Sequence, residues 1–178
     1  PAEYAVLVTS YRDKTRMWKA NHILNVANWL RGKGIEPVFV GKTDMDATAR
    51  QEIQPKDALP NDVSDYGLDL RNRTTIPELA ALMANAKVVC GLDSGPNHLA
   101  GTTDVPIVCG YTSVSPEYRI PIRREGKTYA IAPELECIGC ESRWCSSTWN
   151  FENCFYGHIN CCALMTAQRF INVLDTFL

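Results

Sequence analysis

Two polar loops contain the side chains best suited to chemistry, and each directly follows a short apolar run. The first loop, residues 9–16 (TSYRDKTR), has three cationic side chains, one carboxylate and four hydroxyl groups. Lysine supplies a point charge and arginine a two-pronged donor, so Lys14 and Arg16 could hold the phosphate groups of a ligand. The alternative is a charged loop that contacts only solvent.

The second loop, residues 93–98 (DSGPNH), turns directly into a predicted helix. Gly95 would let a ligand approach the backbone, and the amides at the start of a helix attract anions. Asp93 would cap the helix or accept a hydrogen bond from a sugar hydroxyl, and His98 lies one turn further on, facing back toward the loop. A helix cap beside a structural histidine is the alternative interpretation.

Eight cysteines give the chain a third chemical feature. Cys90 and Cys109 stand alone in apolar runs, which is typical of buried thiols. The other six begin with a C-x2-C pair, which suits a tetrahedral zinc or iron site, although disulfides or reduced thiols would fit the same spacing. These six are Cys137, Cys140, Cys145, Cys154, Cys161 and Cys162.

The composition indicates a globular protein of one domain. The chain has 178 residues, of which 46% are hydrophobic and 21% charged, and its formal net charge is −2. This charge argues against a nucleic-acid-binding protein, and no apolar run approaches the ~20 residues that cross a bilayer. The start at Pro1, without methionine or a leader, suggests a processed or excised piece and a cytoplasmic location.

Apolar runs and helical patterns alternate along the chain. Thr75 and Glu78 have the spacing of a capping box at the start of one helix. The predicted strands are residues 4–9, 38–40, 68–70, 87–92 and 105–109, and the predicted helices are 19–33, 47–54, 75–85 and 96–100. This alternation predicts an α/β fold in which a Rossmann-like parallel sheet carries helices on both faces.

The predicted sheet suggests where a ligand would bind. In an open parallel sheet, ligands bind beyond the carboxyl ends of the strands, so both polar loops are candidates for one site. We expect a single domain over residues 1–178, in which a cysteine-rich subregion at 137–162 precedes a terminal helix at about 163–178.

The second loop resembles a signature of the heptosyltransferase family, glycosyltransferase family nine. Residues 93–100 read DSGPNHLA, which is similar to the family element D-[ST]-G-x-x-H-L-A, and residues 9–14 resemble its T-T-x-x-D-K loop, here followed by Trp18. The resemblance covers nearly all of the chain but only the C-terminal half of a family enzyme. It implies half of a GT-B fold, the half that holds most of the sugar nucleotide.

The resemblance also implies a role for individual residues. The first loop would contact the diphosphate or the adjoining sugar, with Arg16 as the alternative to Lys14 because two extra residues precede Trp18. Asp93 would meet sugar hydroxyls, the residues after it would hold phosphate, and Thr74 matches a position that contacts the base. The implied ligand-binding residues are Thr9, Ser10, Lys14, Arg16, Thr74, Asp93, Ser94, Gly95 and His98.

The function implied by the resemblance is that of the donor-binding domain of an inverting glycosyltransferase. Its ligand would be a nucleotide sugar such as ADP-heptose, transferred to a hydroxyl acceptor without a cofactor. The catalytic base and the acceptor site lie in the N-terminal domain of the family, so this chain would contain no catalytic residue and would need that domain or a partner subunit. The alternative is a non-catalytic nucleotide-sugar-binding module or a cysteine-rich interaction module.

The cysteine-rich subregion resembles that of autotransporter heptosyltransferases, which bind iron and assemble into rings. The resemblance therefore implies a structural zinc or iron and allows a homo-oligomer. The four ligands expected are Cys137, Cys140, Cys154 and Cys161.

Overall fold

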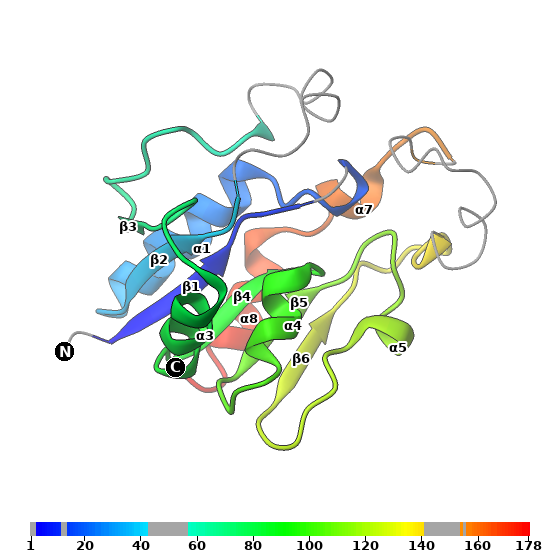
Figure 1. The fold of residues 1–178 in the computed structure, drawn as a ribbon. Helices are drawn as coiled ribbons and strands as arrows, with labels where there is room; N and C mark the ends of the chain where they lie inside the picture. Colours follow the sequence, from blue (N-terminus) through cyan, green and yellow to red (C-terminus); the bar gives the residue numbers. More distant parts are fainter. Residues whose placement is uncertain (1–2, 12–13, 43–56, 141–153, 155) are drawn as a thin grey trace.

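A single parallel sheet organises the molecule. The computed structural model describes residues 3–11, 14–42, 57–140, 154 and 156–178. Its six strands lie in the order β3-β2-β1-β4-β5-β6, and every neighbouring pair is parallel (Figure 1). The strands are β1 (Tyr4–Val8), β2 (Glu36–Val40), β3 (Leu68–Asp69), β4 (Val88–Leu92), β5 (Ile107–Gly110) and β6 (Thr128–Ile131). The predicted Rossmann-like fold class is therefore confirmed.

The strand order contains one reversal of direction across the sheet. From β1 the chain moves outward to β2 and β3, and then returns to place β4 on the other side of β1. In open parallel sheets this reversal opens a crevice beyond the carboxyl ends of the two central strands, which is where ligands bind. The predicted first and second polar loops follow β1 and β4, so they flank this position.

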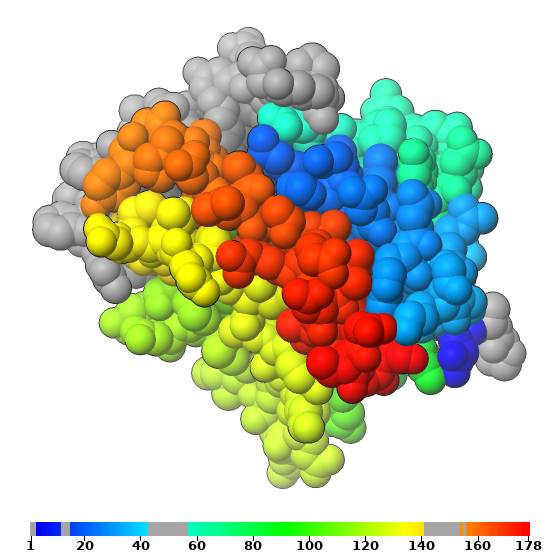
Figure 2. Space-filling model, turned by 180° about the vertical axis from the view of Figure 1, so that it is seen from behind, coloured from blue at the N-terminus to red at the C-terminus, as the bar shows by residue number. Residues whose placement is uncertain are grey.

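Helices cover both faces of the sheet. On one face, α1 and α8 lie side by side and bury Leu7 of β1 together with Leu30 and Phe170 (Figure 2). On the other face, Val6 and Val8 of β1 belong to a second cluster that includes Met83. The helices are α1 (Ala20–Gly32), α3 (Ile76–Ala84), α4 (Gly95–Ala100), α5 (Pro116–Arg119), α7 (Asn160–Ala163) and α8 (Ala167–Leu174), with the 3-10 turn η1 at Lys14–Arg16.

Most predicted elements are present, with three differences. The capping box forms as expected, because Thr75 Oγ1 accepts a hydrogen bond from the Glu78 amide while the Glu78 carboxylate accepts one from the Thr75 amide. The sequence patterns missed the strand β6 and the two short helices α5 and α7, and the terminal helix is only the eight residues of α8. The predicted helix at 47–54 lies outside the described residues. No helix in the described ranges is long and apolar enough to cross a membrane.

Gly91 in β4 offers a test of how tightly the central strands pack. A Cβ atom at this position would lie 2.8 Å from Val8 Cβ and 3.1 Å from Asn97 Nδ2. Because Val8 is on the neighbouring central strand, we expect Gly91→Ala to lower the free energy of unfolding by about 1–3 kcal/mol in urea titrations. Gly32→Ala in α1 is the control, since nothing lies within 4 Å of its Cβ. If both variants are equally stable, the described packing at Gly91 is wrong.

Candidate functional site

The carboxyl ends of β1 and β4 bring the two predicted loops together. Thr9 continues β1 by one residue, since its amide donates a 2.9 Å hydrogen bond to the Val40 carbonyl and its hydroxyl donates a 3.0 Å bond to the same oxygen. Asp93 continues β4 in the same way, through a 3.0 Å bond from its amide to the Gly110 carbonyl. Both loops therefore leave the sheet at one edge with a fixed direction.

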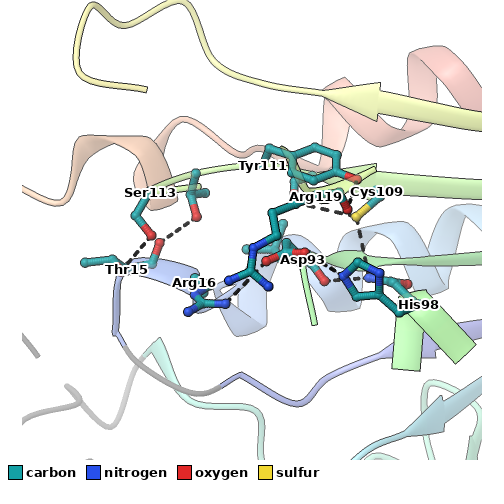
Figure 3. A network of polar contacts seen from close by, with 12 residues as sticks. Thr15, Arg16, Asp93, His98, Cys109, Tyr111, Ser113 and Arg119 are labelled. Atoms are coloured by element: carbon teal, nitrogen blue, oxygen red, sulfur yellow. Dashed lines mark hydrogen bonds and ion pairs between the residues drawn. The ribbon is translucent and has the colours of Figure 1, made fainter. Parts of the chain in front are cut away.

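A buried ion pair joins the two loops. Arg16 Nη1 in η1 lies 3.3 Å from Asp93 Oδ2, and His98 Nε2 in α4 lies 3.3 Å from Asp93 Oδ1. Figure 3 shows the carboxylate between the two nitrogen-bearing side chains. The Arg16 and Asp93 side chains are 9% and 3% exposed. A charge buried to this degree is tolerated only when it is paired, so each side chain requires the other.

The turn that carries Arg16 is attached to two other segments. The Thr15 hydroxyl donates a 3.0 Å hydrogen bond to Ser113 Oγ, and the Thr15 carbonyl accepts a 2.6 Å bond from the Thr112 hydroxyl (Figure 3 labels Thr15 and Ser113). The Cys162 thiol of α7 lies 3.1 Å from the same carbonyl oxygen. These four side chains are all buried. The position of Arg16 therefore depends on β5 and α7 as well as on Asp93.

Ser94 and Gly95 form the start of α4. Ser94 is the N-cap residue by its extended backbone, yet its side chain makes no capping bond. Its Oγ atom is buried and has no hydrogen-bond partner among the described residues. Gly95 is exposed, and nothing lies within 4 Å of where its Cβ would be. A buried hydroxyl without a partner beside an open backbone position is suited to a polar ligand.

The remaining predicted ligand contacts lie along the same edge of the sheet. Ser10 packs against Gly41 at the end of β2, where a Cβ would lie 2.8 Å from the Ser10 amide nitrogen. The Asn72 amide donates a 2.9 Å bond to the Gly41 carbonyl, which brings the segment leading to Thr74 to this edge. Thr74 is half-buried immediately before the cap of α3. The structure does not describe the side chain of Lys14.

Asp93 does not cap helix α4, which was one of its two predicted roles. Its carboxylate pairs with Arg16 and His98, and the N-cap position belongs to Ser94. The prediction that His98 faces back toward the loop is confirmed by its contact with Asp93. His22 is half-buried in α1, and burial lowers its pKa.

Sequence reasoning missed the segment after β5. Thr112 and Ser113 support η1, and the buried Tyr111 hydroxyl donates a 3.3 Å bond to the Arg119 carbonyl. Burial raises the pKa of Tyr111 well above its ordinary value, so it stays protonated. A run of hydroxyl-bearing residues directly after a predicted strand was the available signal, because such a run reaches the same edge of the sheet.

The predicted metal ligands are brought together only in part. Burial raises the pKa of the Cys137 thiol, and the nearby Cys161 and Cys154 raise it further. Cys137 is thus near Cys161 and near Cys154, and thiolates are suitable ligands for zinc or iron. In the described ranges, however, no three His, Cys, Asp or Glu side chains are grouped as a metal site requires. Cys145 lies outside those ranges. Cys90 and Cys109 are buried thiols, as predicted.

Comparisons with known proteins agree on one family. The model of glycosyltransferase family 9 (heptosyltransferase) matches residues 2–150. Lipooligosaccharide heptosyltransferase 2 of Haemophilus influenzae is 28% identical over 107 residues, which are 60% of this chain and 30% of that protein. The chain therefore spans less than a third of the length of this curated relative.

Two solved structures share the fold over 99% of this chain. ADP-heptose LPS heptosyltransferase II of E. coli superposes with a TM-score of 0.69 at 18% identity, over 46% of its length. The iron-containing dodecameric glycosyltransferase TibC of enterotoxigenic E. coli gives a TM-score of 0.75 at 20% identity, over 45% of its length. TibC has also been solved in complex with ADP-D-β-D-heptose.

The buried ion pair predicts a large effect of a small substitution. Asp93→Asn keeps the shape of the side chain but removes the carboxylate charge that pairs with the buried Arg16 guanidinium. We expect the free energy of unfolding to fall by roughly 2–4 kcal/mol. Asp175→Asn is the matched control, because Asp175 pairs with Lys33 at 2.7 Å while 60% exposed. That variant should change stability by no more than about 0.5 kcal/mol. Equal effects in urea titrations would show that the Arg16–Asp93 pair is not buried.

Proposed function

The chain belongs to glycosyltransferase family 9, the heptosyltransferase family, and we propose on this basis that it binds the nucleoside diphosphate of a sugar donor between the loops after β1 and β4. The observation that carries the proposal is the juxtaposition of a buried arginine, Arg16, with the start of α4. There the Ser94 hydroxyl is buried and without a partner among the described residues. A diphosphate is the ligand that satisfies both groups, since phosphate oxygens accept hydrogen bonds from guanidinium and hydroxyl donors.

The proposed contacts follow from the chemistry of each group. Arg16 and the Ser94 hydroxyl donate to phosphate oxygens, and Gly95 admits the diphosphate to the backbone. Asp93 and His98 are left for the hydroxyls of the sugar. Thr9, Ser10 and Lys14 also contact the diphosphate, and Thr74 contacts the nucleobase of the donor. ADP-heptose is the proposed donor because TibC, of similar fold, was solved with that compound.

The proposed reaction is an inverting transfer to an acceptor hydroxyl. The acceptor oxygen attacks the anomeric carbon, and the bond from that carbon to the diphosphate breaks. Negative charge then grows on the departing phosphate, and the guanidinium of Arg16, a side chain only 9% exposed, stabilises that charge. We assign no catalytic base to this chain and propose that acceptor and base are supplied by the part of a family enzyme that it does not span. The chemistry needs no cofactor.

We further propose a structural metal in the cysteine-rich subregion. Cys137, Cys140, Cys154 and Cys161 are the proposed ligands, and iron or zinc would order the segment rather than take part in transfer. The iron-containing, dodecameric TibC supports both the metal and a homo-oligomer. A cytoplasmic location stays a prediction.

Ser94→Ala tests the proposed diphosphate site. The substitution removes a buried hydroxyl that has no partner in the described structure, so the free energy of unfolding should change by less than about 0.5 kcal/mol or rise. The affinity for ADP should fall by about two- to tenfold, the value of one hydrogen bond. Isothermal titration calorimetry with ADP, GDP and UDP measures the affinity, and urea titration measures the stability. The chain alone should bind without transferring sugar.

Ser115→Ala is the matched control. Ser115 Oγ accepts a 3.3 Å hydrogen bond from the Glu117 amide at the start of α5. Its removal should cost about 0.5–2 kcal/mol of stability and leave ADP affinity unchanged. If the wild-type chain binds none of the three nucleotides, the proposal fails and a non-catalytic interaction module is favoured.

Metal content can be measured independently of nucleotide binding. Elemental analysis should find about one zinc or iron per chain, and Cys137→Ser should remove most of it, whereas Cys90→Ala should not. Because metal binding needs thiolates and burial raises the pKa of Cys137, the retained metal should decrease as the pH is lowered. A metal content unaffected by Cys137→Ser would contradict the ligand set.

A further inference from the structure

The peptide unit between Thr15 and Arg16 is held at its oxygen by two side chains. The Thr15 carbonyl accepts one hydrogen bond from the Thr112 hydroxyl at 2.6 Å and one from the Cys162 thiol at 3.1 Å. A carbonyl oxygen has two lone pairs, so these two donors match its capacity. The carbonyl of Thr15 and the amide of Arg16 share one rigid plane. The two bonds therefore fix the plane from which the Arg16 side chain projects toward Asp93.

The contact of Thr112 and Cys162 with the Thr15 carbonyl is shielded from solvent. Thr112 and Cys162 are each 1% exposed, and Thr15 is 7% exposed. A hydrogen bond is stronger in such surroundings than at the surface, and water cannot replace a donor that is removed. Loss of the thiol would thus remove one of the two hydrogen bonds described at the Thr15 carbonyl.

The two donors come from different parts of the fold. Thr112 directly follows β5, whereas Cys162 lies in α7, which packs beside η1 (Figure 1). The chain enters α7 through Ile159, whose backbone is left-handed with φ 49°. The neighbouring residue of the same short helix is Cys161, one of the sulfurs that interact with Cys137. The Cys162 thiol thus connects the cysteine-rich subregion to the turn that carries Arg16.

We propose that Cys162 is a positioning residue for Arg16 and acts through the Thr15 carbonyl. The inference rests on the proposed binding of a nucleoside diphosphate, because it is there that the placement of Arg16 matters. Cys162 would touch neither ligand nor metal. It orients the peptide unit so that the guanidinium of Arg16 reaches the diphosphate beside Asp93.

The test compares two variants of Cys162 by calorimetric titration with ADP. Cys162→Ala removes the donor and should weaken ADP binding by about two- to tenfold. Cys162→Ser restores a donor and should return the affinity to within about twofold of wild type. Cys90→Ala is the control, because Cys90 is equally buried but lies in the middle of β4. It should leave ADP affinity unchanged. Metal content is measured in each variant, so that a lost metal is not mistaken for a lost hydrogen bond.

Two double-variant measurements separate positioning from a general structural effect. In an Arg16→Ala background, Cys162→Ala should change ADP affinity less than about 1.5-fold, because its target is gone. In urea titrations without ligand, the coupling between Arg16→Ala and Asp93→Asn should shrink when Cys162→Ala is added. If the wild-type chain does not bind ADP but Cys162→Ala reduces the coupling between Arg16→Ala and Asp93→Asn, the proposed function is overturned and the positioning role remains. If Cys162→Ala binds ADP normally and does not change the coupling between Arg16→Ala and Asp93→Asn, the positioning role is overturned and the proposed function remains.

Discussion

A buried carboxylate at the end of β4 governs the arrangement of this site. Asp93 is 4% exposed, and a charge removed from water to that extent needs a counter-charge in contact with it. Arg16 supplies it from the loop after β1, and His98 contacts the second carboxylate oxygen from α4. The requirement draws η1 back over the sheet edge and sets the first turn of α4 opposite it. The ion pair of Arg16 with Asp93 and the contact of His98 therefore lie at the carboxyl ends of β1 and β4, where the strand order reverses.

The fold was largely predictable because its elements carry local signals. Val88–Leu92 is apolar throughout and buried on both sides, and Thr75 with Glu78 marks a helix start that depends only on residues three apart. β6 was missed because it is a four-residue strand at the edge of the sheet, where only Ile131 is buried. Its existence depends on pairing with β5, a tertiary contact that no local pattern records.

The site was predictable as a pair of loops but not as a set of contacts. The position of both loops follows from the rule that parallel strands end at one edge. That Arg16 contacts Asp93 does not follow, because it depends on how the residues after Thr9 turn back. The contacts of Thr112 and Cys162 with the Thr15 carbonyl could not be predicted from the sequence, because they join segments that are far apart in the chain and share no motif. The resemblance to a family implied the candidate ligand-binding positions, whereas their side-chain partners are set by the tertiary fold.

The contact between Thr15 and Cys162 has a consequence for how the molecule folds. The two residues are 147 positions apart in the chain. Closing so long a loop has a large entropic cost, and contacts of high sequence separation slow folding. The turn that carries Arg16 is therefore completed only after α7 has docked. During synthesis on the ribosome, this order would leave the turn that carries Arg16 without its contact to Cys162 until α7 has emerged and docked.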